Sequence, residues 1–156
     1  MNNNEKWMKI AIKQAILAES NGEVPVGAVL VNDGKIIASS HNSSISKHDP
    51  SAHAEVELLR MAGFKLKNYR LDNAELYVTL EPCMMCISAI IQARIAKVYF
   101  GAFDSKMGAC GSCEDFRSLS CFNHEVMIEG GILESDCKYI LQSFFKSRRK
   151  ISKKAL

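Results

Sequence analysis

The sequence predicts an α/β protein, a three-layer α/β/α sandwich built on one mixed five-stranded sheet. Two apolar runs joined by an Asp33-Gly34 turn predict an antiparallel hairpin near the N-terminus. After this hairpin, helical and strand patterns alternate along the chain, which favours a sheet covered by helices on both faces. The 156 residues are enough for one domain and too few for two. We therefore expect residues 1–156 to form a single domain.

Hydrophobic spacing gives each element its expected bounds. Residues 5–20 carry apolar side chains at helical spacing, and Asn21-Gly22 is a stop signal. Later helices are expected to run from His53 until Gly63 closes the helix, from Cys83 to about Arg94, and onward from Ile132. The expected strands, which are rich in apolar and β-branched residues, are 24–31, 35–38, 76–80, 97–101 and 125–128. Loops are expected at 43–51 and 102–124, the second with one helical turn near Asp115-Phe116.

Composition limits the class of protein. With 47% hydrophobic and 24% charged residues, the chain is typical of soluble globular proteins. The N-terminal residues lack the pattern of a secretory signal, and no apolar run approaches the length of a membrane span. We therefore expect a cytoplasmic protein without a membrane partner. Its six cysteines are expected to be reduced thiols.

The net charge of +3 comes from the C-terminal end of the chain. Six of the 20 basic residues and none of the 17 acidic ones lie in residues 146–154. A basic tail, residues 146–156, on a mildly acidic body is a plausible contact for a phosphate backbone. The alternative is a solvated helix end, because cations also suit a helix C-terminus.

The chemistry is predicted by His53-Ala54-Glu55 together with Pro82-Cys83-Met84-Met85-Cys86. A proline at the start of a helix and two cysteines three residues apart place both thiols on one face of a first turn. Two thiolates and the His53 imidazole leave a zinc ion with one open position, as in catalytic zinc sites. Zinc lowers the pKa of a bound water to about 7, and Glu55, which is not needed as a ligand, is the predicted proton carrier. This pattern is typical of zinc nucleobase deaminases.

Three further segments narrow the family. The chain resembles the bacterial tRNA-specific adenosine deaminases of the cytidine deaminase-like superfamily in residues 23–31, 48–55 and 77–86. It also resembles them in Gly101-Ala102 followed by Asp104. The resemblance covers nearly the whole chain. It implies a cytidine deaminase-like fold, one Zn²⁺ per chain, and hydrolytic deamination of adenosine to inosine at the wobble position of an arginine tRNA. It also implies a homodimer that binds the tRNA anticodon stem-loop.

The same resemblance implies roles for individual residues. Asn42 would hydrogen-bond the flipped-out adenine, and the base would lie against a pocket wall at the entrance of the first strand. On this reading the substrate-binding residues are Asn42, Val26, Ala54, Asp104, Asn123, Phe144, Arg148 and Arg149. Four of them also have a structural alternative: Asn42 as a strand-end turn residue, Asp104 and Asn123 as loop formers, and Phe144 as a core residue.

The sequence departs from the family at Phe103, where a polar or charged residue is more usual. A phosphate contact there would be replaced by stacking, so the local contacts with the anticodon are open. Another cluster, Cys110, Cys113, Cys121 and His124, can be read as a second zinc site or as ordinary loop thiols. Its spacing is short for such a site, which favours the thiols.

Two rival functions remain open at this point. One is a deaminase of free guanine or cytosine from the same superfamily, which would use the same zinc chemistry. The other is a non-catalytic RNA-binding subunit on a deaminase scaffold. Glu55 argues against the second rival, because a binding module needs no proton carrier beside an open zinc position.

Overall fold

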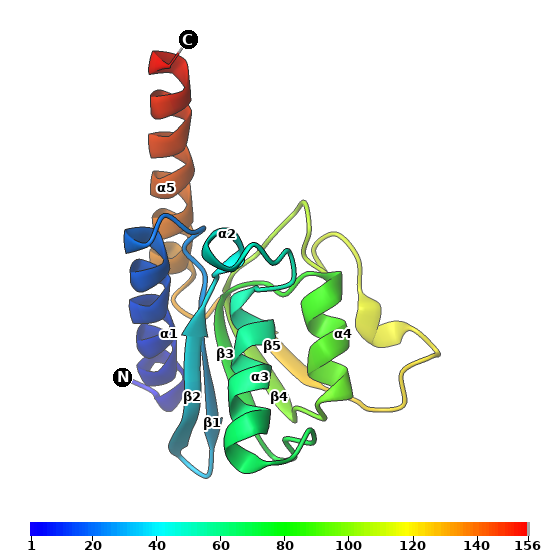
Figure 1. Ribbon diagram of the computed structural model, residues 1–156. Coiled ribbons are helices and arrows are strands. Elements are labelled where there is room, and N and C mark those ends of the chain that lie inside the picture. Colours follow the sequence, from blue (N-terminus) through cyan, green and yellow to red (C-terminus); the bar gives the residue numbers. More distant parts are fainter. Residues whose placement is uncertain (156) are drawn as a thin grey trace.

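Five strands form one mixed sheet in the order β2-β1-β3-β4-β5 in the computed structural model, which describes residues 1–155 (Figure 1). The central strand β3 is antiparallel to β1 and parallel to β4, and β4 is parallel to β5. The predicted sandwich and its mixed sheet are confirmed. The strand bounds are Gly27–Asn32 for β1, Lys35–His41 for β2, Glu75–Leu80 for β3, Lys97–Ala102 for β4 and Met127–Gly130 for β5.

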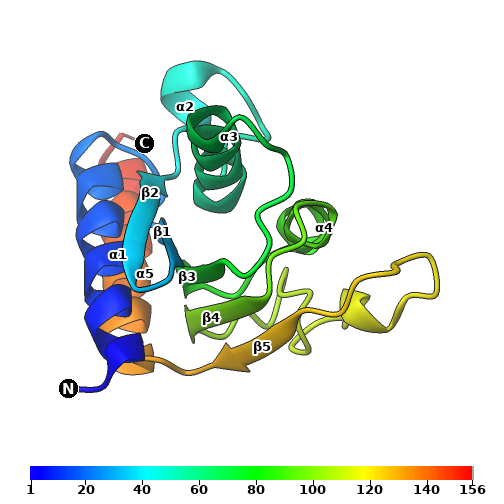
Figure 2. The same ribbon diagram turned by 90° about the horizontal axis from the view of Figure 1, so that it is seen from below.

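The helices cover the sheet on both sides. Figure 2 shows α1 and α5 together on one face, and α3 and α4 on the other. The helix bounds are Asn3–Ser20 for α1, Ser44–Lys47 for α2, Ala54–Leu66 for α3, Met84–Gln92 for α4 and Glu134–Lys154 for α5, with a 3-10 turn, η1, at Phe116–Ser118. This arrangement encloses a core in which β1, β3 and β4 are buried along nearly their whole length.

The contact of α1 with the sheet depends on one glycine. Gly27, the first residue of β1, lies so close to α1 that a Cβ atom there would be 2.0 Å from the carbonyl oxygen of Ala11. Only a residue without a side chain allows this approach. Gly27 at the strand entrance therefore packs against α1 and not against a substrate.

Strand direction explains why α3 and α4 begin at the same edge of the sheet. Both β2 and β3 are antiparallel to β1, so β2 and β3 point the same way. The chain therefore leaves β2 and β3 at the same carboxyl edge of the sheet. There α3 begins after the short helix α2, with His53 as its N-cap, and α4 begins directly after β3, with Cys83 as its N-cap. The positive ends of two helices meet there.

Some predicted bounds were wrong. Gly63 does not close α3; the helix continues to Leu66 and ends at Lys67, which takes a left-handed conformation. A glycine inside a helix costs only about 1 kcal/mol relative to alanine, so the rest of the helix overrides it. The expected loop 43–51 contains the short helix α2, whose first backbone N–H groups are held by the Glu23 carboxylate. Pro82 precedes the cap of α4 instead of lying in its first turn.

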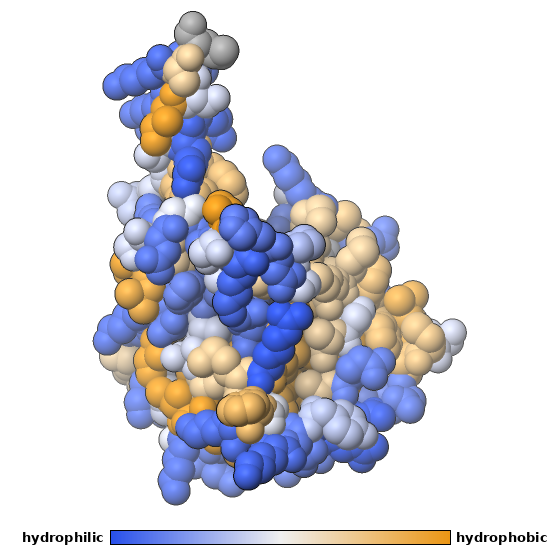
Figure 3. Space-filling view, in the orientation of Figure 1, coloured by the Kyte–Doolittle hydropathy of each residue, from blue (hydrophilic) through white to orange (hydrophobic). Residues whose placement is uncertain are grey.

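The last helix, α5, carries the basic tail away from the sheet (Figure 1). Figure 3 shows mostly hydrophilic side chains on this projection, with a small hydrophobic patch among them. Ile151 is an exposed hydrophobic residue of α5. The predicted tail, 146–156, is helical through Lys154, and Leu156 lies outside the described residues. Within residues 1–155, the helices are all too short or too polar to cross a membrane.

Candidate metal and substrate site

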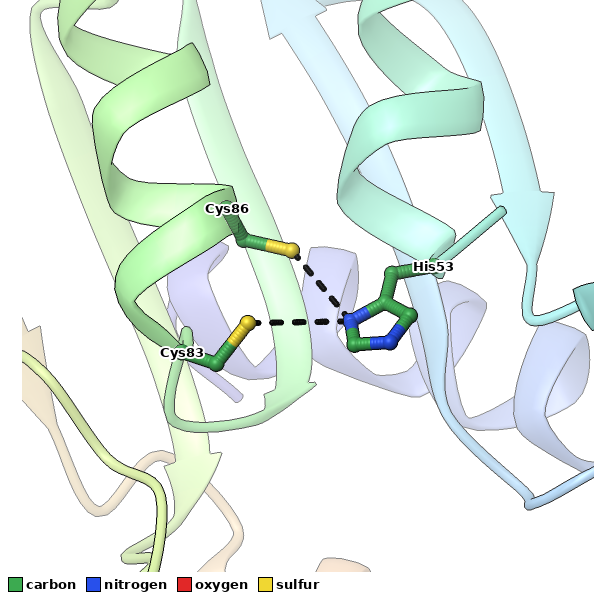
Figure 4. Close-up of side chains that lie close together, drawn as sticks. All are labelled: His53, Cys83 and Cys86. Carbon is green, nitrogen blue, oxygen red and sulfur yellow. Dashed lines mark hydrogen bonds between the residues drawn. The ribbon is translucent and has the colours of Figure 1, made fainter. Parts of the chain in front are cut away.

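The three predicted metal ligands meet at the N-termini of α3 and α4. Figure 4 shows one nitrogen of the His53 ring facing the sulfur atoms of both Cys83 and Cys86. The Nδ1 atom of His53 lies 3.7 Å from the Cys83 Sγ atom and 3.5 Å from the Cys86 Sγ atom. Cys86 is fully buried in the first turn of α4, whereas His53 and Cys83 are partly exposed. The cluster is therefore accessible from the side of His53 and Cys83, which are the N-cap residues of α3 and α4.

These distances fit a zinc ion. Bond lengths of 2.3 Å to sulfur and 2.0–2.1 Å to nitrogen at a tetrahedral angle require an N···S separation of about 3.5 Å. Among residues 1–155, His53, Cys83 and Cys86 are the only group of three or more His, Cys, Asp or Glu side chains whose ligand atoms all lie within 4.8 Å of one another. The proposed second zinc cluster is therefore not assembled. Its His124 ring instead contacts the Ile95 carbonyl oxygen at 2.7 Å.

The surroundings of the thiols favour a thiolate. Hydrogen bonds from Cys86 and then from His53 lower the pKa of Cys83 to about 4. The same interaction raises the pKa of Cys86, which keeps its proton while it donates to Cys83. The hydrogen bond between His53 and Cys83 also raises the pKa of His53. Metal binding requires both cysteines to lose their protons, and Cys83 is already prepared to do so.

Glu55 lies in the first turn of α3 beside these ligands, and only 4% of it is exposed. Burial is the main cause that raises its pKa to about 7, and the negative charge of Cys83 adds to the effect. A carboxyl group that gains and loses a proton near neutral pH can act as both base and acid. The structure thus gives Glu55 the environment that a proton carrier needs.

One small pocket joins this cluster to several predicted substrate residues. Its volume is about 210 Å³, and its lining is Val24, Val26, Asn42, His53, Glu55, Leu80, Glu81, Cys83, Asp104 and Met107. The Oδ1 atom of Asn42 accepts a hydrogen bond of 2.8 Å from the backbone N–H of Ala54. The Asn42 side-chain NH₂ is therefore the end left for a ligand. Ala54 itself is fully buried and acts here through its backbone.

A larger groove of about 700 Å³ continues from this pocket toward α5. The pocket and the groove share four lining residues: Val24, Leu80, Asp104 and Met107. The groove adds aromatic and basic side chains, among them Phe103, Phe145, Lys106 and Arg149. A ligand whose end enters the small pocket can therefore extend past aromatic rings toward the basic tail.

The structure does not bring three other predicted residues to the pocket. Phe144 is 8% exposed and packs in the core. The Arg148 guanidinium lies 5.0 Å from the Phe144 ring and donates a 2.7 Å hydrogen bond to the Gly22 carbonyl. Asn123 accepts a 2.9 Å hydrogen bond from Arg94, which follows α4 at the end opposite the cysteines. The structural alternatives given above for Phe144 and Asn123 describe these two positions well.

Sequence reasoning missed part of the lining. Met107 and Phe145 reach the groove from separate segments, and nothing in the sequence marks them as neighbours. Phe103, the position at which the sequence departs from the family, lines the same groove. Glu81 carried a usable signal, because it is a charged residue at the end of an apolar strand, immediately before Pro82-Cys83.

Comparisons with known proteins place this site in a family. Residues 1–102 match the family of the cytidine and deoxycytidylate deaminase zinc-binding region. A solved structure from studies of A-to-I editing by tRNA:A34 deaminases has a TM-score of 0.85 and 45% identity, covering 87% of this chain and 99% of the other. A guanine deaminase structure from Bacillus subtilis has a TM-score of 0.62 and 42% identity, over 66% of each chain.

A full-length relative makes the assignment more specific. The tRNA-specific adenosine deaminase of Bacillus subtilis (strain 168) is 45% identical over 155 residues, which are 99% of this chain and 96% of that protein. The similarity therefore extends through the pocket, the long loop and α5. The chain belongs to the tRNA-specific adenosine deaminase family.

Proposed function

We propose that residues 1–156 form one zinc-dependent domain that converts adenosine to inosine at the wobble position of a tRNA, with an arginine tRNA as the expected substrate. The observation that carries this proposal is a single pocket that contains His53, Cys83, Glu55 and Asn42 and opens into the groove bearing Arg149. Because the substrate is tRNA, we propose that the enzyme acts in the cytoplasm.

The size of the pocket favours one extruded base. About 210 Å³ is small compared with the roughly 300–1,000 Å³ of pockets for drug-sized ligands. A nucleotide chain cannot enter it, so the target base must leave its neighbours, which then lie in the adjoining groove. The loop of an anticodon already presents unstacked bases, which reduces the cost of this step.

The residues of the pocket divide the chemistry among them. Zinc, held by His53, Cys83 and Cys86, supplies a water that is activated at neutral pH. Glu55 accepts the proton that this water loses as its oxygen adds to C6 of adenine, and delivers the proton to N1. Glu55 then carries the proton of the added hydroxyl to the amino group, which leaves as ammonia. The free NH₂ of Asn42 donates to an acceptor atom on the purine edge, while Val26 contacts the face of the base.

The direct test compares four substrates. Purified protein is incubated with an unmodified arginine tRNA carrying A at the wobble position, and inosine is read as G by sequencing. Free adenosine, cytidine and guanine are assayed in parallel for release of ammonia. Inosine confined to the wobble position supports the proposal. Release of ammonia from a free base, with the tRNA unchanged, would show that the protein is a deaminase of free bases or nucleosides. No reaction with any substrate would favour the non-catalytic RNA-binding subunit.

Arg149 is expected to contribute to RNA binding through charge alone. Arg149→Gln should weaken tRNA binding and reduce the slope of log affinity against log salt concentration by about 1. Lys9→Gln is the matched control, because it removes one exposed positive charge from α1, outside the groove. Equal salt slopes for Arg149→Gln and the unmodified protein would show that the RNA does not follow the groove.

We further propose that the protein is a homodimer that associates through the outer face of α3 and α4. A groove of about 620 Å³ runs between these helices and is lined by residues such as Leu59, Ala89 and Ala93. Beside it, Phe64 is 89% exposed and Tyr69 is 74% exposed. Large aromatic side chains exposed beside an apolar groove are typical of an interface between proteins.

Phe64→Glu is expected to shift the protein from dimer to monomer, because it replaces a highly exposed aromatic side chain of α3 by a charge. Sedimentation velocity at micromolar concentration measures the change. Tyr139→Glu is the control, since Tyr139 is also an exposed aromatic residue but lies on α5, on the other side of the sheet. Unchanged sedimentation of Phe64→Glu would contradict this interface.

A further inference from the structure

The Glu81 carboxylate is buried beside the pocket and has no role in the reaction described above. It is 2% exposed and follows β3 directly, two residues before Cys83. Its Oε1 atom accepts hydrogen bonds of 3.1 Å from the backbone N–H groups of Cys110 and Ser112. Its Oε2 atom accepts one of 3.0 Å from the backbone N–H of Asp104 and another from the Ser112 hydroxyl. One carboxylate thus binds four donors from a single loop.

This bonding leaves the carboxylate nothing to offer a substrate. A carboxylate has about four acceptor positions, two on each oxygen, and all four are used. Two backbone hydrogen bonds also join the Glu81-Pro82 segment to its neighbours. The Glu81 N–H donates to the Ala102 carbonyl at 2.8 Å, and the Ala109 N–H donates to the Pro82 carbonyl at 2.9 Å. Glu81 is therefore placed to hold a loop and not to bind a ligand.

Packing around Gly108 supports the same conclusion. A Cβ atom at Gly108 would lie 2.5 Å from the Glu81 carboxyl group and 2.4 Å from the Asp104 carbonyl oxygen. The loop backbone therefore passes directly against the carboxylate, with no room for a side chain. Such close contact makes the position of the loop sensitive to the hydrogen bonds of Glu81.

The loop held by Glu81 forms part of the pocket wall. Asp104 and Met107 line both the pocket and the groove. The Oδ1 atom of Asp104 accepts hydrogen bonds from the backbone N–H groups of Lys106 and Met107, at 3.0 and 3.1 Å. A continuous series of contacts therefore runs from Glu81 through Asp104 to Met107.

We propose that Glu81 is a positioning residue that fixes the 103–113 loop as a wall of the substrate site and thereby sets how tightly tRNA binds. The proposal rests on the proposed tRNA deaminase function, because Asp104 and Met107 then face the flipped base and its neighbours. Since Glu81 contacts neither the reacting atoms nor the metal ligands in this arrangement, it acts on binding more than on proton transfer.

The test replaces the carboxylate by an amide. Glu81→Gln keeps the shape but turns an NH₂ group toward two donors, which breaks the hydrogen bonds of one oxygen. The amides of Asp104, Cys110 and Ser112 should then exchange with deuterium at least about tenfold faster, and KM for tRNA should rise about tenfold. Zinc content should not change, and kcat should fall less than about threefold. Glu114→Gln, the same change at the exposed residue that follows this loop, should alter none of these quantities.

A milder variant covers the case in which Glu81→Gln does not fold. Ser112→Ala removes one of the four donors and leaves the carboxylate in place, so it should change exchange and KM in the same direction by a smaller factor. Unchanged exchange of the loop amides, or a fall in kcat with unchanged KM, would overturn the proposal. The exchange measurement needs no substrate, so it still decides the role of Glu81 in the loop if the unmodified protein fails to edit tRNA.

Discussion

Glu55→Ala is expected to lower kcat for tRNA deamination by about 10³- to 10⁴-fold while the protein keeps its zinc. The reason is that Glu55 carries both protons of the reaction, whereas His53, Cys83 and Cys86 provide the ligands. Loss of the carboxylate therefore removes proton transfer without opening the metal site. Single-turnover assays of inosine formation, with zinc measured in the same samples, separate the two effects.

Glu55→Gln provides the matched control for this prediction. It preserves the size of the side chain in a buried position and should be as inactive as alanine, because an amide cannot accept and return a proton. Thermal unfolding of both variants establishes that the fold is retained. An alanine variant that kept full activity would disprove the assigned mechanism.

Cys86→Ser is expected to remove both zinc and activity. Cys86 is the fully buried ligand, and serine in its place offers a hydroxyl where the soft thiolate is needed. Elemental analysis should find zinc falling from one ion per chain to a small fraction, and tRNA editing should fall to background in parallel.

Cys113→Ser is the matched control, because Cys113 is an exposed thiol outside the group of metal ligands. It should retain both zinc and activity. Partial zinc loss in Cys113→Ser, or more than one zinc per unmodified chain, would support a second zinc site that includes Cys113. Full zinc content in Cys86→Ser would show that another donor completes the site.

The sheet and the ligands could be predicted because their signals are local. The strands are continuous apolar runs, and the ligands lie at fixed short spacings around two helix starts. The end of α3 could not be read in this way. Gly63 is a common stop residue, but the helix ends where Lys67 adopts the left-handed conformation, a property that its residue type does not indicate.

Met107 could not be predicted as part of the pocket wall, because its place depends on the path of a long loop. Asp104, which the family resemblance implies as a substrate contact, belongs to the same loop, and four donors of that loop converge on Glu81. Residue type also did not indicate that the Arg148 guanidinium donates a hydrogen bond to the Gly22 carbonyl, and its contact with RNA stays a prediction. A sequence shows which groups are available, while tertiary contacts decide which of them remain free.

The position of the ligands at two helix caps has a consequence for folding. His53 and Cys83 are separated by an α-helix and a central strand, so a metal ion that both of them bind closes a long loop of the chain. The unfolded chain cannot present this cluster at low cost, since closing such a loop reduces its conformational entropy. Zinc therefore binds the native state selectively and acts as a cross-link between α3 and α4. We therefore expect the bound ion to add to thermal stability, so that chelation should lower the melting temperature of the protein as well as its activity.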